Sequence, residues 1–430
     1  MKLTLNPLIS LRFVIFALFT LFNFPDMMLK IFSILLLVIL PALSFSQYTP
    51  QQIAKAGKIH NRVFTIDSHA DTPMNLFDAK FDVSEDNSQT LHRSKVDFPR
   101  MKKGGLDGIF FAVFEGQGSR TAAGNIAVKK RALATFDSIH SVLKRYPQLA
   151  ELALTPEDGY RLEKAGKRAI FIGLENGYPI GRELNNIKLF FDLGARYITL
   201  CHTKNNDICS SSTDTNNNIG LSVFGKQVVA EMNRLGMMVD VSHVSDASFY
   251  DVLKLSKVPV IASHSCARAL CDNRRNLSDD MLIALSKNGG VVQMCILSAY
   301  VKTPVPNPER DSAFVALRVR WHNFQDLSES EMDSARRDWW RVEEKYPQVL
   351  ANVSDVCNHI DHMVKIAGIN HVGIGTDFDG GGGVNGCNDV SEMGNITLEL
   401  VKRGYSERQI RKIWGGNFMR VMRKVGQLAI

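Results

Sequence analysis

Eight short apolar runs recur along the chain, and their spacing constrains its fold more than any other feature of the sequence. Most of them are followed by polar residues and then by a segment with helical periodicity. The runs are almost continuously apolar, which is typical of parallel strands buried on both faces. They span residues 63–66, 108–114, 169–172, 197–200, 238–241, 258–262, 290–294 and 372–374.

The segments between these runs carry helix signals. Residues 125–146 have helical periodicity, with Ile126, Phe136 and Leu143 among the apolar residues expected on one side. Ser245 and Ser278 precede two further periodic segments, as N-capping residues do. Eight alternations of strand and helix predict an α/β fold, a (β/α)₈ barrel of the TIM type. A doubly wound open sheet is the alternative, but no Gly-x-Gly-x-x-Gly motif follows the first strand.

One stretch, residues 303–346, interrupts this alternation. It is long and charged, begins with three prolines, and carries Trp321, Trp339 and Trp340. We expect a helical insertion between the seventh and eighth strands, on the loop side of the barrel. It could cover a site or contact another subunit, and a plain surface decoration is the alternative.

The first 46 residues are expected to be a leader, with residues 47–430 forming a single barrel domain. Lys30 precedes an apolar run at residues 31–40, and Ser44 and Ser46 supply small residues before a cleavage point after Ser46. This pattern predicts a signal peptide and therefore an exported protein, periplasmic or secreted. An uncleaved leader that associates the protein with a membrane is the alternative.

Charge and cysteine content exclude some classes of protein. The formal net charge is +7, but no run rich in Lys and Arg is present, so we expect no nucleic-acid partner. The seven cysteines show no Cys-x-x-Cys spacing. Because their number is odd, at least one thiol is expected to be free or paired with another chain.

Metal-ligand residue types follow most of the predicted strands. His69 and Asp71 are two residues apart at the end of the first strand, so their side chains point to the same face. The carboxyl ends of parallel barrel strands meet at one mouth, where active sites lie. Four of the 11 histidines stand at such strand exits, which indicates a functional set. The residues that follow the other strands are Glu175, His202, His243, His264, Asp377 and Asp379.

These residue types indicate zinc. Imidazoles and carboxylates without thiolates suit a catalytic zinc with open positions. Three histidines and two carboxylates are more than one such ion needs, so we expect two ions with Glu175 as the bridging ligand. Two metals about 3.5–4 Å apart would hold a bridging hydroxide and polarise a carbonyl, which is hydrolytic chemistry. No Gly-x-Ser-x-Gly nucleophile motif competes with this interpretation.

Taken together, the motifs resemble those of the membrane (renal) dipeptidase family, peptidase family M19, whose members are amidohydrolase-like barrels. The resemblance runs from about residue 63 to about residue 422, and the order and spacing of the motifs agree. The matching segments are Ile66-Asp67-Ser68-His69-Ala70-Asp71, Gly173-Leu174-Glu175, Leu200-Cys201-His202-Thr203, Asp240-Val241-Ser242-His243, Ser263-His264-Ser265, Arg274-Arg275-Asn276-Leu277-Ser278-Asp279-Asp280, Gly375-Thr376-Asp377-Phe378-Asp379-Gly380 and Gly415-Gly416-Asn417.

The resemblance implies a ligand set for two zinc ions per chain. His69 and Asp71 would bind one ion, His243 and His264 the other, and Glu175 would bridge them. The family cleaves dipeptides and often tolerates a D-residue at the C-terminal position, and some members open β-lactams. The implied partner is therefore a small dipeptide, and a homodimer remains an open alternative to a monomer.

It also implies roles for three residues outside the ligand set. His202 would stabilise the oxyanion of the tetrahedral intermediate. Arg275 would clamp the terminal carboxylate of the substrate, whereas the adjacent Arg274 is expected to be structural. Asp377 would take the proton of the attacking water and pass it to the leaving amine.

Two segments differ from the family pattern, and they leave the substrate open. Residues 205–218 are rich in Asn, Asp, Ser and Thr, and the 303–346 insertion is absent from animal members. A barrel hydrolase with the same metals that acts on N-acyl amino acids or cyclic amides is the main alternative. A catalytically silent protein that keeps the fold is a second one, although all five ligand positions are intact.

Overall fold

The computed structural model of the protein describes residues 48–214, 219–324 and 327–429. The compact unit that contains the barrel spans Pro50–Ile430. The predicted leader, residues 1–46, lies outside the described residues. In the part of the chain that is described, every helix is too short or too polar to span a bilayer.

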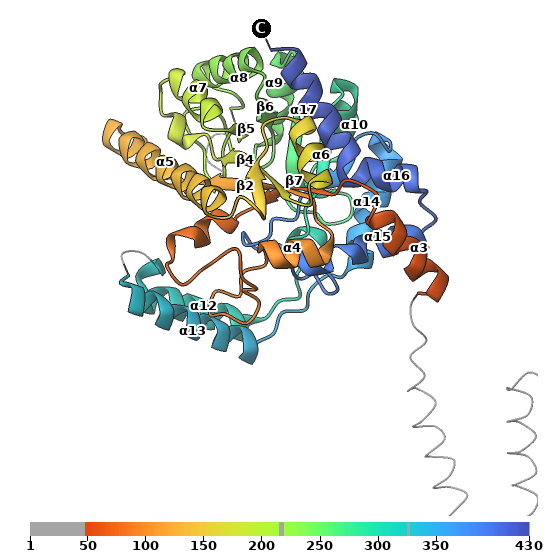
Figure 1. Ribbon diagram of the computed structural model, residues 1–430. Helices are drawn as coiled ribbons and strands as arrows, with labels where there is room; N and C mark the ends of the chain where they lie inside the picture. The colour runs from red at the N-terminus through yellow and green to blue at the C-terminus, as the bar shows by residue number, and fades with distance from the viewer. Residues whose placement is uncertain (1–47, 215–218, 325–326, 430) are drawn as a thin grey trace, which may run out of the picture. The chain divides into compact units, whose positions relative to one another are not determined.

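Eight parallel strands form the predicted barrel in the order β1-β2-β4-β5-β6-β7-β8-β9. Figure 1 shows β2, β4, β5, β6 and β7 with helices around them. The first and last strands meet at their carboxyl ends, where Ala70 pairs with Phe378 and the Asp71 amide donates to the Phe378 carbonyl at 2.8 Å. The strands are β1 Ile66–Ala70, β2 Gly108–Phe114, β4 Arg168–Glu175, β5 Ala195–Thr199, β6 Met238–Asp240, β7 Ile261–Ser265, β8 Val291–Met294 and β9 Val372–Ile374.

Two of the predicted strands were placed too early in the sequence, and one short strand was missed. Strand β1 begins at Ile66 and β7 begins at Ile261, and both run on through polar residues as far as Ala70 and Ser265. Apolarity alone could not predict this, because the polar residues are buried and hydrogen-bonded inside the barrel. The additional strand β3, Ala150–Leu152, pairs only with β4 at the edge of the sheet.

An apolar cluster fills the barrel interior below the mouth. Seven strands contribute to it, and the C-terminal helix α17, Asn417–Gln427, packs against the same cluster through Phe418, Met419 and Val425. The polar strand-exit residues therefore lie directly above a closely packed apolar core. The strand residues of the cluster are Ile66, Phe110, Ala169, Phe171, Tyr197, Met238, Ile261 and Val291.

Helices cover the outside of the barrel. The capping predictions are confirmed, since the Ser245 and Ser278 side chains each accept a backbone N–H at a helix start. The predicted placement of Ile126 on the packed side is wrong, because this side chain is 71% exposed. The helices are α3 Pro50–His60, α4 Phe98–Gly104, α5 Ala122–Arg145, α6 Pro156–Lys164, α7 Asn185–Asp192, α8 Val223–Leu235, α9 Asp246–Leu255, α10 Asp279–Asn288, α14 Val353–Ala367, α15 Gly394–Lys402 and α16 Glu407–Arg411.

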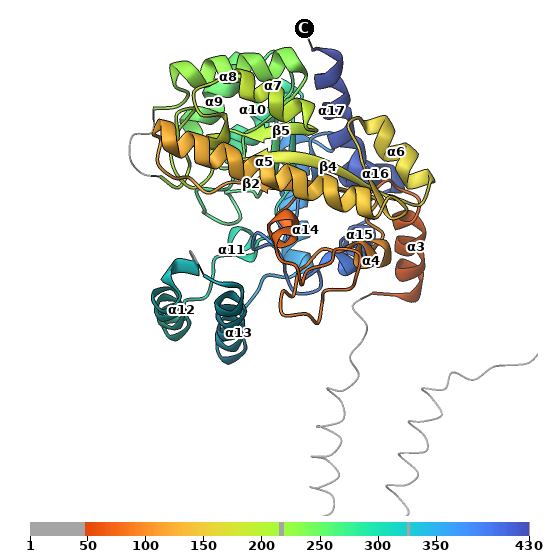
Figure 2. The same cartoon turned by 60° about the vertical axis from the view of Figure 1, so that its left-hand side comes forward.

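The predicted insertion is helical and lies between β8 and β9. A short helix, α11 Ser298–Val301, leads into α12 Pro308–Arg320 and α13 Glu329–Lys345, which lie side by side (Figure 2). Helix α13 is tied to the segment that follows β1: Arg336 Nη1 lies 2.6 Å from Asp78 Oδ2, and Trp340 Nε1 donates to the Leu91 carbonyl at 2.9 Å. The insertion therefore packs on a loop at the carboxyl end of the strands, as expected.

All seven cysteines lie in described segments of the chain, where each is buried and none forms a disulfide. The sequence expectation of at least one unpaired thiol is therefore confirmed.

Candidate metal centre

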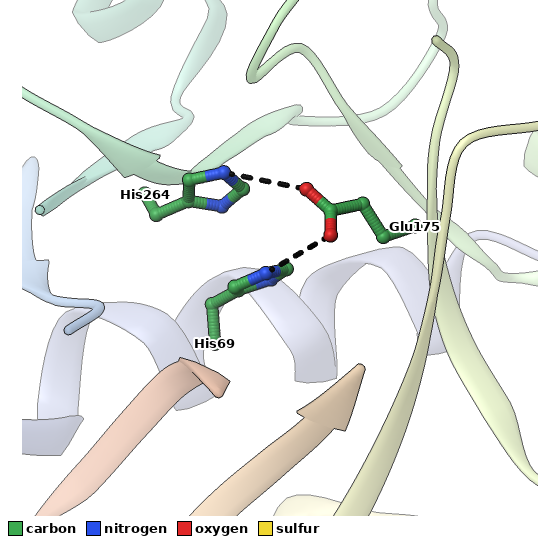
Figure 3. A group of neighbouring side chains, drawn as sticks. All are labelled: His69, Glu175 and His264. Carbon is green, nitrogen blue, oxygen red and sulfur yellow. Dashed lines mark ion pairs between the residues drawn. The ribbon is translucent and has the colours of Figure 1, made fainter. Parts of the chain in front are cut away.

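Glu175, the last residue of β4, lies at the centre of the predicted ligand set. Its Oε2 is 3.4 Å from His69 Nε2, whereas its Oε1 is 3.5 Å from His264 Nε2 (Figure 3). The same Oε1 is 3.0 Å from His243 Nε2. The two oxygens of one carboxylate thus face different histidines. This is the arrangement that a carboxylate needs if it is to bridge two ions.

His69 and Asp71 approach the same centre from the end of β1. Their side chains converge, with His69 Nε2 lying 3.6 Å from Asp71 Oδ2. The spacing of two residues along a strand places both on one side, as the sequence predicted. Asp71 is already past the last strand residue, where the barrel closes against Phe378.

His243 and His264 reach the centre from β6 and β7. Their Nε2 atoms lie 2.8 Å apart. His243 has a φ of 68°, a left-handed conformation that is uncommon for a residue other than glycine. Such backbone conformations persist where surrounding structure enforces them, and they cluster at functional sites.

The donor set fits divalent metal ions. Three groups of side chains could each hold one, because their ligand atoms lie within 4.8 Å of one another. Two of the buried ligand atoms, His69 Nε2 and Asp71 Oδ1, have no hydrogen-bond partner among the residues described here. Buried polar atoms are almost always paired, so these two atoms fit a site in which they would bind a cation. The groups are His69, Glu175 and His264; Glu175, His202 and His243; and His69, Asp71 and Asp377.

The electrostatics of the centre favour the same conclusion. Burial by itself would raise the pKa of Glu175, but His69, His202 and His243 hold it well below its usual range. Burial lowers the pKa of both His243 and His264 well below the usual histidine value. Glu175 therefore presents an ionised carboxylate, and His243 and His264 present neutral imidazoles, the protonation states in which these groups bind metals. Burial by itself would lower the pKa of His69, but Tyr197, Glu175 and Asp71 raise it well above the usual histidine value, so a metal ion would take the place of a proton on this ring.

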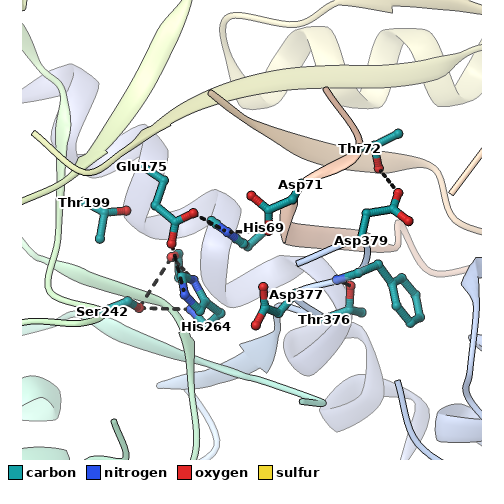
Figure 4. Close-up of polar contacts among 12 residues, drawn as sticks. His69, Asp71, Thr72, Glu175, Thr199, Ser242, His264, Thr376, Asp377 and Asp379 are labelled. Atoms are coloured by element: carbon teal, nitrogen blue, oxygen red, sulfur yellow. Dashed lines mark hydrogen bonds and ion pairs between the residues drawn. The ribbon is translucent and has the colours of Figure 1, made fainter. Parts of the chain in front are cut away.

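Asp377 lies beside the ligands, three residues beyond β9. It has a φ of 63° and is buried close to Asp71 and Cys295 (Figure 4). Burial raises its pKa well above the usual value, and Cys295 and Asp71 raise it further. A glycine is needed next to this pair, because a Cβ at Gly380 would lie 2.0 Å from Asp71 Oδ2 and 2.4 Å from Asp377 Oδ1.

His202 and Arg275 are placed on the outer side of this centre. The His202 ring is 4.3 Å from that of His243, centroid to centroid, and its side chain is 21% exposed. Arg275 is buried, and its Nη2 donates to the His264 carbonyl at 3.1 Å. Its Nε has no partner within the described ranges of the chain. Arg274 is exposed and faces solvent, and the structural role expected for it stays a prediction.

Several residues of this region were missed as functional candidates. Tyr197 was counted only as part of an apolar strand, yet its hydroxyl lies 2.9 Å from His69 Nδ1. Asp67 and Asp240 lie within the family motifs, but no role was assigned to them. Asp379 was identified as a strand-exit residue but given no role; it accepts hydrogen bonds from Thr72 and two further donors and fixes the turn after Asp377 (Figure 4). The usable signal was a carboxylate inside an apolar run, which is costly unless it is paired.

Comparisons with known proteins agree with this geometry. The model of the membrane dipeptidase family, peptidase family M19, matches residues 53–430. Dipeptidase 3 of Mus musculus is 32% identical over 370 residues, which cover 84% of this chain and 64% of the mouse protein. The chain thus spans less than two thirds of the length of that relative.

Solved structures share the barrel. The probable dipeptidase PvdM from Pseudomonas aeruginosa has a TM-score of 0.76 and 30% identity, covering 89% of this chain and all of that one (100%). A metallopeptidase from Rhodobacter sphaeroides, solved with a phosphinate mimic of the dipeptide L-Ala-D-Ala, has a TM-score of 0.68 at 22% identity and covers 84% of this chain and 99% of that one. On the strength of the family match, this chain belongs to the membrane dipeptidase family, peptidase family M19.

Proposed function

We propose that the protein is a zinc-dependent dipeptidase that hydrolyses the peptide bond of dipeptides. The observation that carries the proposal is the position of Glu175, whose two carboxylate oxygens face different histidines at the mouth of the barrel. Family membership and the probable dipeptidase PvdM support the choice of dipeptides.

In this proposal five residues hold two zinc ions. His69 and Asp71 bind one ion, His243 and His264 bind the other, and Glu175 bridges them. When bound, the ions would polarise the scissile carbonyl and lower the pKa of the attacking water. Nitrogen and oxygen donors without thiolates suit zinc at a catalytic site.

Two further residues act on the reacting groups. Asp377 accepts the proton of the attacking water as a carboxylate and then donates that proton to the leaving amine; its raised pKa makes it a stronger base than an ordinary carboxylate. His202 stands at the exposed edge of the centre and donates from Nε2 to the oxyanion of the tetrahedral intermediate.

Arg275 binds the terminal carboxylate of the substrate. Its Nε lacks a partner in the described structure, although the side chain is buried, so a bound carboxylate would complete its hydrogen bonding. A free carboxylate at this end distinguishes dipeptides from cyclic amides. An N-acyl amino acid also carries this carboxylate, and a C-terminal D-residue could still present it, so both belong in the test.

We further infer that the protein is exported, since residues 1–46 have the pattern of a signal peptide. Sequencing the mature N-terminus after cell fractionation tests this inference. Cleavage after Ser46 is expected, and an intact leader in the cytosolic fraction would contradict export.

The central experiment combines metal analysis with a substrate panel. Purified protein should contain two zinc ions per chain and should cleave L-Ala-L-Ala and L-Ala-D-Ala faster than N-acetylalanine or hydantoin. Full activity after exhaustive chelation would overturn the proposal. Faster turnover of N-acetylalanine or hydantoin would show that the substrates are N-acyl amino acids or cyclic amides rather than dipeptides.

A paired substitution tests the bridging carboxylate. Glu175→Gln should lose zinc and lower the rate by more than about 100-fold, since even an outer partner of a ligand costs about 10- to 100-fold. Glu115→Gln is the matched control: Glu115 follows the adjacent strand β2 and is buried, but it pairs with Arg131 at 3.0 Å. This control should keep its zinc.

A further inference from the structure

Two of the histidines at the centre are hydrogen-bonded at Nδ1, the ring nitrogen that faces away from Glu175, by a side-chain hydroxyl. Each hydroxyl donates its own hydrogen bond to an oxygen that can only accept hydrogen bonds. His69 is held in this way by Tyr197, and His264 by Ser263. A single hydroxyl proton cannot serve two acceptors at once, so these contacts have a direction.

The first chain of bonds ends on a backbone carbonyl. Tyr197 Oη donates to the Ser68 carbonyl at 3.1 Å and lies 2.9 Å from His69 Nδ1. Because a carbonyl only accepts, the tyrosine proton is used there, and His69 must donate its Nδ1–H to the tyrosine. In the neutral imidazole, the form that binds a metal, the lone pair of His69 is then left on Nε2, the atom that faces Glu175 and Asp71.

The second chain of bonds ends on a buried carboxylate. Asp240 Oδ1 accepts the backbone N–H groups of Ser242 and Ser263 at 3.0 and 2.8 Å. Its Oδ2 accepts the hydroxyls of Thr199 and Ser263 at 2.5 and 2.6 Å. Since the Ser263 hydroxyl donates its hydrogen bond to Asp240, its oxygen must accept the Nδ1–H of His264, 2.8 Å away.

The contact between His243 and His264 agrees with this direction. Their Nε2 atoms are 2.8 Å apart, so one of the two carries the hydrogen. If His264 is protonated at Nδ1, its Nε2 is the acceptor, and in the metal-free protein His243 donates from Nε2, which also lies 3.0 Å from Glu175 Oε1. Zinc would displace this hydrogen when His243 binds.

We infer that Tyr197, Ser263 and Asp240 are positioning residues that hold His69 and His264 with the proton on Nδ1 and the lone pair on Nε2, ready to bind metal. The inference rests on the proposed zinc function but concerns how the ligands are prepared for the ions. It also explains why residue 173 is a glycine, since a Cβ there would lie 2.1 Å from the Tyr197 ring.

The decisive variant is Asp240→Asn. Its side chain has the same shape as that of aspartate, but it reverses the direction of the hydrogen bonds that link residue 240, Ser263 and His264. The amide oxygen can keep the two backbone N–H bonds, while the NH₂ group replaces Oδ2 and donates to both hydroxyls. Ser263 is then free to donate to His264 Nδ1, which moves the histidine proton to Nε2. Spectra of metal-free protein with ¹⁵N-labelled histidine report this change, which a merely structural role would not produce.

Zinc affinity provides the second measurement. Competition with a chromogenic chelator on the full mature chain should show about 10- to 100-fold weaker binding of zinc for Asp240→Asn, Ser263→Ala and Tyr197→Phe. Two variants serve as controls and should keep the affinity. Ser265→Ala removes a buried hydroxyl of the same strand that lacks a partner in the described structure, and Tyr405→Phe removes a tyrosine hydroxyl bonded to Asp361 far along the chain.

The outcomes separate this inference from the function on which it rests. Wild-type protein that binds no zinc would overturn the function and the inference together. Wild-type protein that binds two ions, with unchanged affinity and an unchanged His264 proton in Asp240→Asn, would overturn the inference alone. Weaker binding in Asp240→Asn, Tyr197→Phe and Ser263→Ala, with the histidine proton moved in Asp240→Asn, would support it.

Discussion

Two adjacent arginines show how strongly the environment separates residues of the same chemistry. Arg274 is exposed, whereas Arg275 is buried with its guanidinium 5.4 Å from the centre of the Tyr300 ring and one Nη bonded to the His264 carbonyl. The hydrogen bond to the backbone of His264, a candidate ligand, fixes the arginine relative to the centre. Only one of the pair can therefore serve a substrate held there.

This contrast leads to a prediction for the arginine pair. Arg275→Ala should raise KM for dipeptides by about 10- to 100-fold, since a hydrogen bond to a charged group contributes about 1.5–3 kcal/mol. Its zinc content should stay at the wild-type level. Steady-state kinetics and metal analysis are the measurements, and Arg274→Ala is the matched control. An unchanged KM in Arg275→Ala, or an equal rise of KM in both variants, would contradict the proposed binding of the substrate carboxylate by Arg275.

At the scale of elements, helix α13 connects the 303–346 insertion to the segment after β1, at the mouth of the barrel. Arg336 reaches across to Asp78 in the segment after β1, while the next residue, Arg337, has its hydrogen bond within the described part of the chain to Ser334 of its own helix. The segment after β1 follows the candidate ligand Asp71 directly. The insertion can thus restrain a loop that begins at the centre.

We therefore expect Arg336→Ala to loosen that loop. Hydrogen exchange of residues 78–93 should become faster, because the ion pair is partly buried and joins segments distant in the sequence. Exchange in the strands should not change. Arg337→Ala, one residue away, should leave residues 78–93 as protected as in the wild type, and a similar loss of protection in both variants would contradict the proposed restraint.

For the whole molecule, the seam of the barrel passes through the site. The Asp377 amide donates to the His69 carbonyl at 3.0 Å, which joins the first and last strands beside the candidate ligands. Three buried carboxylates, those of Asp71, Glu175 and Asp377, lie close together there. Cations would stabilise such an arrangement, because like charges in a buried site repel one another.

Removing metal should therefore lower the stability of the whole molecule. A ligand that binds only the folded state stabilises it by about 2.7 kcal/mol at a concentration 100 times its Kd. We expect Tm to fall by several degrees in a chelator and to recover with added zinc. The far-UV circular dichroism at low temperature should stay the same, because the apolar core is independent of the ligands.

Glu175→Gln provides the control for this measurement. If the effect comes from the centre, Tm of this variant should respond little to zinc or chelator. Identical Tm values for wild-type protein with and without chelator would show that the centre does not contribute to stability through metal.

Patterns between neighbouring residues were enough to predict much of the fold. The alternation of strands and helices and the insertion are confirmed, and strands β2, β8 and β9 lie where the apolar runs placed them. The residues that meet at the centre were also identifiable, because the ends of parallel strands converge at one mouth. Strands β1 and β7 were misplaced because their buried polar residues are paired with partners distant in the sequence.

The sequence by itself therefore determined the barrel and the set of polar residues at its mouth, since both follow from apolar runs and from residues close together in the chain. Only the tertiary structure decided which atoms meet. It places Tyr197 against His69, Ser263 between Asp240 and His264, and Arg275 rather than Arg274 beside the centre. Such pairings join residues on different strands, and their direction depends on distances of a few tenths of an ångström, which no local pattern of residues encodes.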